Sequence, residues 1–228
     1  FYQTHKNIKH LFILNENTRL YGQIFNLNFK KTKNYLIDRL SISFLIRFLN
    51  LKVLFLTNSF ITNVTSSVFK KKVCLDKILN MIEDKYSIVV IPEDTYDKIS
   101  VKRKSFTKIE VEAEMVLDVR SSWVRLDDYM LDLRKRYRNK IKKIIERTNH
   151  IEVIHFSSTD LEKYTSEMQL LFNQIVKKSR FRGPEFNVDS FVLFVEKGFM
   201  QVYGYFLEDK LIGFSSEIVQ EDSLYSYF

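Results

Sequence analysis

The chain has 228 residues, of which 45% are hydrophobic and 28% charged, a balance that favours a packed core and excludes wholesale disorder. Five glycines and two prolines exclude collagen-like and low-complexity classes, and the one cysteine, Cys74, excludes an intrachain disulfide. Four histidines and that cysteine leave little for a metal site, so none is expected. The formal net charge of +8 fits either an AT-rich genome or an anionic partner.

Before residue 116, apolar runs that predict buried strands alternate with segments of helical spacing. The strands are expected over 8–14, 20–29, 51–57 and 86–91, and the helices over 33–50 and 75–85. The tetrapeptide Asn15–Thr18 has turn composition and separates the first two strands. Residues 108–119 fit either a strand or an extended crossover. This alternation predicts a mixed α/β fold built in layers.

The second half of the chain opens with a long amphipathic pattern that predicts one helix over 127–148. A strand over 151–156 precedes a helix that the capping-box spacing Thr159–Glu162 would open. A short helix should run from its cap at Asn187 to Lys197, with Gly198 after its end. Three strands complete the pattern, over 200–207, 211–219 and 223–228, with three-residue turns Glu208–Lys210 and Gln220–Asp222 between them.

This order of strand, two helices and an antiparallel meander resembles the GNAT acyltransferase fold up to its fourth strand. The residues are similar to those of GNAT-like proteins allied to the FemABX peptidoglycan aminoacyltransferases. The similar segments are Trp123–Tyr129, Leu133–Arg138, Leu171-Phe172, Val176–Phe181 and Tyr205–Phe214. The resemblance is good over 116–228 and weak before it. It implies two GNAT-like halves, 1–115 and 150–228, joined by a helical segment over 116–149.

The family resemblance also implies the chemistry, which is transfer of an acyl group to an amine. The donor would be acyl-CoA or, as in many FemABX enzymes, aminoacyl-tRNA, and the acceptor a small-molecule amine or a cell-wall precursor of peptidoglycan biosynthesis. GNAT enzymes bind the CoA pyrophosphate at a glycine-rich turn after the fourth strand. That turn would follow Phe228, so we expect the second half to be incomplete. The chain starts at Phe1 instead of Met and stops inside an apolar run, so both ends are expected to be cut. A cytoplasmic protein is expected.

The predicted strand 211–219 supplies the main catalytic candidate, Glu217. Its face also carries the small residues Gly213 and Ser215, which leave room for a substrate, whereas Ile212, Phe214, Ser216 and Ile218 suit a core. Glu217 is the candidate general base, directly or through water. The alternative is a solvated strand glutamate. Tyr225 and Tyr227 are candidate proton donors to the leaving group, with cross-strand aromatic packing as the alternative.

The substrate-binding candidates are Arg180, Arg182, Tyr203, Tyr205 and Ser215. By the resemblance, the loop that carries the two arginines borders the acceptor site, and together they would clamp a carboxylate or phosphate. An ordinary surface loop is the alternative.

Most of the net charge lies in one predicted helix. Residues 134–147 hold eight bases and one acid, a local charge of +7 out of +8. Arg134, Arg136, Arg138 and Lys142 are the candidate residues for tRNA or another anion. An alternative function follows, a non-catalytic module that binds RNA or an anionic surface, with peripheral membrane contact. A solvated face of an amphipathic helix explains the charge equally well. No DNA-binding motif and no membrane-spanning segment is expected.

Overall fold

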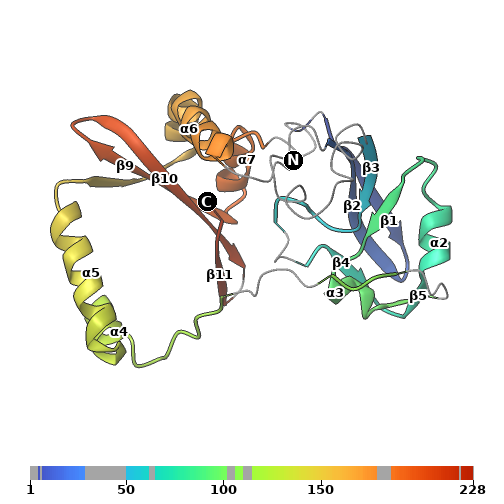
Figure 1. Cartoon of the computed structure of the whole chain (residues 1–228), viewed down its shortest axis with the longest axis horizontal. Coiled ribbons are helices and arrows are strands. Elements are labelled where there is room, and N and C mark those ends of the chain that lie inside the picture. The colour runs from blue at the N-terminus through green and yellow to red at the C-terminus, as the bar shows by residue number, and fades with distance from the viewer. Residues whose placement is uncertain are drawn as a thin grey trace, which may run out of the picture.

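The computed structural model describes residue 5 and residues 7–28, 50–61, 65–101, 106–109, 115–178, 186–220 and 222–227. Within these ranges the chain forms six helices and eleven strands, and the strands make three sheets (Figure 1). The predicted mixed α/β class is therefore confirmed. Residues 33–49 of the predicted helix over 33–50 lie outside the described residues, and so do the loop residues Arg180 and Arg182.

The larger sheet is built from the first part of the chain. Its strands run in the order β1-β2-β3-β6, and β4 also pairs with β2. All of its pairs are antiparallel except β3 with β6, which is parallel. The strand bounds are β1 (Lys9–Asn15), β2 (Thr18–Asn28), β3 (Asn50–Phe55), β4 (Ser67–Phe69) and β6 (Ile88–Val90).

One hydrophobic core supports this sheet. It combines strand residues such as Leu20, Ile24 and Leu54 with Leu75 and Ile78 of helix α2 (Leu75–Asn80). Helix α2 ends five residues before the predicted bound, because Met81 already forms its C-cap. The remaining short elements are α3 (Glu93–Tyr96) and a parallel pair of strands, β5 (Val73–Cys74) and β7 (Ile99–Ser100).

The smaller four-stranded sheet is antiparallel and belongs to the last part of the chain. Its order is β11-β10-β9-β8, and helices α6 and α7 pack against β9 and β10. The bounds are β8 (Glu152–His155), α6 (Ser158–Lys178), α7 (Ser190–Glu196), β9 (Met200–Leu207), β10 (Lys210–Gln220) and β11 (Ser223–Ser226). The predicted order of strand, helix, helix and three strands is thus present.

The capping box that opens α6 is formed by Ser157 and Asp160, two residues before the predicted Thr159–Glu162. The amide of Ser157 donates to the Asp160 carboxylate at 2.9 Å, and the amide of Asp160 donates to Ser157 Oγ at 3.2 Å. This reciprocal pair satisfies amides that the helix itself leaves unbonded. At the far end of α7, Gly198 follows the helix with φ +75°, as predicted for a glycine at this position.

The two hairpin turns of the smaller sheet are each one residue shorter than predicted. Leu207 pairs with Lys210, and both turn residues, Glu208 and Asp209, have positive φ, as a tight hairpin turn requires. Gln220 likewise pairs with Ser223. A turn shorter by one residue shifts the pairing of the two strands it joins. The turn length therefore decides which side chains lie next to each other across the sheet.

A β-bulge corrects the predicted faces at the start of β10. The register shifts between Leu211 and Gly213, which leaves Leu211 buried and Ile212 exposed, the reverse of the prediction. From Phe214 onward the predicted alternation holds, and Ser216 and Ile218 are buried.

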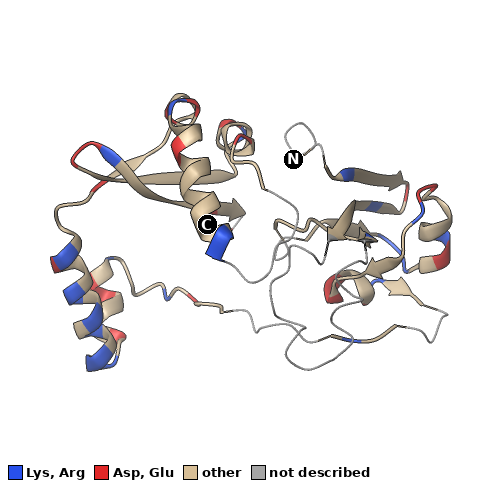
Figure 2. Ribbon diagram, turned by 45° about the horizontal axis from the view of Figure 1, so that its top comes forward, with Lys and Arg blue, Asp and Glu red and all other residues tan. Residues whose placement is uncertain are grey.

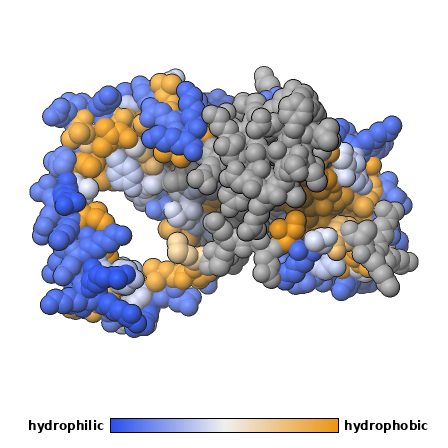
Figure 3. All heavy atoms as spheres, in the orientation of Figure 1, coloured by the Kyte–Doolittle hydropathy of each residue, from blue (hydrophilic) through white to orange (hydrophobic). Residues whose placement is uncertain are grey.

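The predicted single helix over 127–148 is two helices, α4 (Leu126–Asp132) and α5 (Lys135–Thr148), which together we call the helical arm. The helix is interrupted at Leu133, whose ψ of 145° is extended. Lysine and arginine gather along the arm (Figure 2), and no residue of α5 is buried. In the space-filling view an opening separates the arm from the sheet (Figure 3).

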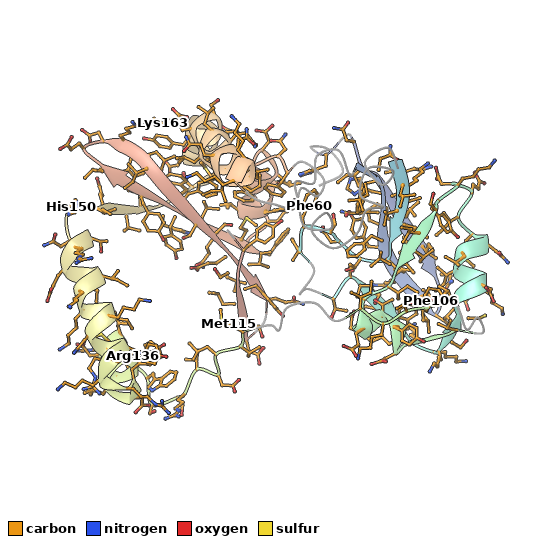
Figure 4. The ribbon with its side chains drawn as sticks, in the orientation of Figure 1. Phe60, Phe106, Met115, Arg136, His150 and Lys163 are labelled. Atoms are coloured by element: carbon orange, nitrogen blue, oxygen red, sulfur yellow. The ribbon has the colours of Figure 1, made fainter. Side chains whose placement is uncertain are left out.

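An aromatic junction connects the two parts of the chain. The buried His5 ring lies 4.6 Å from the ring of Phe60 and 5.1 Å from that of Phe186. Its Nε2 atom accepts the amide hydrogen of Asn187 at 3.0 Å. Phe60 lies between the two sheets in Figure 4. A residue near the start of the chain therefore packs into the core of the smaller sheet.

The core of the smaller sheet is built around Phe156, which is fully buried. Its ring stacks on Tyr164 at 5.4 Å and meets Phe206 edge-on at 6.0 Å. Gly204 leaves the space for this ring, because a Cβ atom at that position would lie 2.2 Å from Phe156 Cζ.

We expect Gly204→Ala to destabilise the protein by about 1–3 kcal/mol or more, because the buried ring of Phe156 has little room to move. Gly213→Ala is the matched control in the neighbouring strand, since its new Cβ would meet nothing closer than 3.8 Å. Urea unfolding followed by circular dichroism measures both. Equal effects of the two substitutions would show that the Phe156 packing is not tight.

Candidate functional site

The face of the smaller sheet turned away from the core carries four of the eight predicted catalytic and substrate-binding residues. In β9, Met200, Val202, Gly204 and Phe206 are buried and the residues between them are half-buried. Across to β10, Gln201 pairs with Glu217, Tyr203 with Ser215, and Tyr205 with Gly213. Directly paired residues share a face, so these side chains lie together. We call this surface the open face, and it includes four predicted residues, Tyr203, Tyr205, Ser215 and Glu217.

Hydrogen bonds fix the polar groups of the open face. The hydroxyls of Tyr205 and Ser215 lie 2.9 Å apart, and the Tyr203 hydroxyl donates to Gln201 Oε1 at 3.0 Å. The side chain of Glu217 is half-buried, between the positions of Gln201 and Ser226 on the flanking strands. A carboxylate in such a place can accept a proton from a substrate, and the hydroxyl groups around it can bond to polar substrate atoms.

The sequence prediction missed His155, at the edge of the open face. His155 pairs with Tyr203, and their rings lie 5.0 Å apart at an angle of 38°. The alternation of β8 alone gives no sign of this contact. It follows from the register of three strands, which places His155, Tyr203 and Ser215 in one row across the sheet.

Tyr225 and Tyr227 lie on the buried face of the smaller sheet, whereas Glu217 lies on the open face. Tyr225 pairs with Ile218, and the amide of Tyr227 donates to the carbonyl of Ser216 at 2.8 Å. The ring of Tyr227 packs near the rings of Phe186 and Phe191. Burial raises the pKa of Tyr227 far above its usual value, so its hydroxyl stays protonated. Both tyrosines pack against the core, in line with the alternative of aromatic packing, and they do not lie on the face of Glu217 as the candidate proton donors would.

The four predicted anion-binding residues of the helical arm differ in their surroundings. The guanidinium of Arg138 donates to the backbone oxygens of Met130, Leu131 and Leu133 at 2.9–3.0 Å. It therefore caps the end of α4, where carbonyls lack helical partners. Arg136 lies over the Tyr137 ring at 4.9 Å, whereas Arg134 and Lys142 are exposed.

The larger sheet carries a polar network that no pattern in the sequence predicted. The amide nitrogen of the buried Gln23 donates to the Tyr21 hydroxyl at 2.8 Å, and its oxygen accepts from the amide and hydroxyl of Ser59. His10 Nδ1 lies against the same Tyr21 hydroxyl. Burial lowers the pKa of His10 and raises the pKa of Tyr21, so both are neutral near pH 7. These bonds satisfy buried groups, and we assign the network a structural role.

Metal ligands do not gather in the described part of the chain, where no three His, Cys, Asp or Glu side chains come together. None of the described helices is long and apolar enough to cross a membrane.

Comparison of the chain with protein-family models, with curated proteins and with solved structures finds no match. The function of the open face therefore has to be inferred from its own residues and geometry.

We expect Arg138→Ala to fray the end of α4, because three carbonyl oxygens lose a charged donor. Loss of about 1–2 kcal/mol would speed amide hydrogen exchange in α4 by roughly tenfold. Arg136→Ala is the matched control, since its side chain contacts Tyr137 and not α4. Mass-spectrometric exchange over Leu126–Leu133 measures both variants. Unchanged exchange in Arg138→Ala would contradict the capping role.

Proposed function

We propose that the protein is an N-acyltransferase that moves an acyl or aminoacyl group to an amine on the open face. The observation that carries the proposal is the position of Glu217, a half-buried carboxylate on the same face as three hydroxyl side chains. The order of elements in the smaller sheet and its helices is compatible with a GNAT-like fold. The residues similar to the FemABX group add support from the sequence.

The chemistry starts with the acceptor. An alkyl amine near pH 7 is an ammonium ion and must lose a proton before it can attack. Glu217 would take this proton, directly or through a water molecule. The amine nitrogen then forms a bond to the carbonyl carbon of the donor, and the tetrahedral intermediate breaks its bond to the leaving group. The attacking nitrogen still carries one surplus proton, which would pass through water to the leaving group, so that group departs as a thiol from acyl-CoA or as a ribose hydroxyl from aminoacyl-tRNA.

The hydroxyl pair of Tyr205 and Ser215 would orient the acceptor. Each hydroxyl can donate one hydrogen bond and accept others, and the 2.9 Å contact between them sets their positions. A small polar amine or the amine of a cell-wall precursor fits this chemistry. Either donor, acyl-CoA or aminoacyl-tRNA, is consistent with the open face.

We expect the chain to transfer acyl groups from one of these donors to an amine, and Glu217→Gln to lower the rate about a hundredfold or more. Thiol release from acyl-CoA and loss of radiolabel from aminoacyl-tRNA measure the two reactions with a panel of amines. Glu152→Gln is the matched control, because this exposed carboxylate on β8 pairs with Phe206 and so lies away from the open face.

Two results would count against the proposal. Transfer that continues at an unchanged rate in Glu217→Gln would remove Glu217 as the base. No transfer from either donor to any amine, by a folded protein, would reject the acyltransferase function.

A further inference from the structure

Apolar and basic side chains lie on different sides of helix α5. An α-helix turns by about 100° per residue, which places Tyr137, Ile141, Ile144 and Ile145 within roughly 100° of the circumference. We call this stripe the apolar arc. Tyr137, Ile144 and Ile145 are 46%, 50% and 45% exposed. A stripe of this kind normally faces a core, but α5 contains no buried residue.

Basic residues border the apolar arc on both sides. Going around the helix, one flank holds Lys135, Arg138 and Lys142, and the other holds Arg136, Lys140, Lys143 and Arg147. The one acid, Glu146, lies with Asn139 on the side opposite the apolar arc. The charge is therefore arranged relative to the apolar arc and is not spread over the helix surface.

We propose that the helical arm binds the surface of an anionic lipid bilayer, with α5 lying in the plane of the interface. The apolar arc would enter the boundary between headgroups and acyl chains. The lysines on the two flanks would extend along the surface and place their ammonium groups among the lipid phosphates. Glu146, on the opposite side, would remain in water. Arg138 is not part of this surface, because its guanidinium already caps α4.

The same arrangement argues against RNA as the occupant of this surface. A phosphate backbone binds best to a continuous basic surface, and it has no apolar part that would bury the three exposed apolar side chains. In α5 the apolar arc divides the bases into two flanks. A bilayer interface satisfies both kinds of group at once.

This surface shares no residue with the open face. A negative result here therefore leaves the acyltransferase proposal untouched, and loss of transfer in Glu217→Gln says nothing about the arm.

Vesicle flotation with the whole chain tests the proposal. We expect binding to vesicles that contain phosphatidylglycerol and at least about tenfold weaker binding to pure phosphatidylcholine vesicles. Replacing both isoleucines, Ile144→Gln with Ile145→Gln, should weaken binding about tenfold, because buried apolar area is lost. Replacing one lysine on each flank, Lys140→Ala with Lys142→Ala, should also weaken it about tenfold.

Helix α6 provides matched controls outside the arm. Leu170→Gln with Ile175→Gln replaces side chains that are 64% and 68% exposed, and Lys177→Ala with Lys178→Ala removes two exposed charges. Both controls should float like the unmodified chain. Circular dichroism checks that each variant is folded.

Equal flotation of the isoleucine variant and the unmodified chain would overturn the proposal, since the apolar arc would then play no part. Absence of flotation with anionic vesicles would overturn it as well. Salt-sensitive binding to tRNA in that case, weakened by Lys140→Ala with Lys142→Ala and unchanged in the isoleucine variant, would identify the arm as an RNA-binding surface.

Discussion

The packing of Phe156 against the bare backbone of Gly204 decides which face of the smaller sheet is buried. The ring occupies the space that any larger residue at position 204 would fill. Helix α6 begins two residues after Phe156, and its Tyr164 stacks on the Phe156 ring, which holds the helix over that face. Because side chains alternate along a strand, burying Gly204 turns Tyr203 and Tyr205 to the opposite side. The open face is thus a consequence of how the core is packed.

The open face and the helical arm divide the chemistry of the chain between two surfaces. The open face presents the carboxylate of Glu217 among hydroxyl groups, a setting suited to moving a proton. Residues 134–147, which include most of α5, carry +7 of the formal charge of +8, and α5 also has a row of exposed apolar side chains, a setting suited to an anionic interface. An acyltransferase that acts on a membrane-attached precursor would use both surfaces, one for position and one for reaction.

Local patterns in the sequence predicted eight of the eleven strands, all but the short β4, β5 and β7, as well as the helices α6 and α7 and the alternation that places Glu217 with Ser215. The division of the arm into α4 and α5 was not predictable in this way. The apolar spacing continues through Leu133, whereas the interruption is stabilised by Arg138 and by Asp132, which accepts hydrogen bonds from Arg120 and Trp123. These contacts join residues five to twelve positions apart, and helical periodicity carries no information about them.

Contacts between different strands, which local sequence patterns do not predict, also decided which candidate site residues lie together. Glu217, Ser215, Tyr203 and Tyr205 were assigned to the site from patterns within single strands, and each lies on the open face. The position of Tyr225 and Tyr227 relative to Glu217 depends on the register between β10 and β11. A three-residue turn would have placed Tyr225 opposite Glu217, but the shorter turn pairs Glu217 with Ser226. His155 was missed for the same reason, since three strands must be aligned to bring it to Tyr203. Registers set by turns therefore decide the composition of a site on a sheet, and one residue is enough to exchange a tyrosine for a serine beside the candidate base.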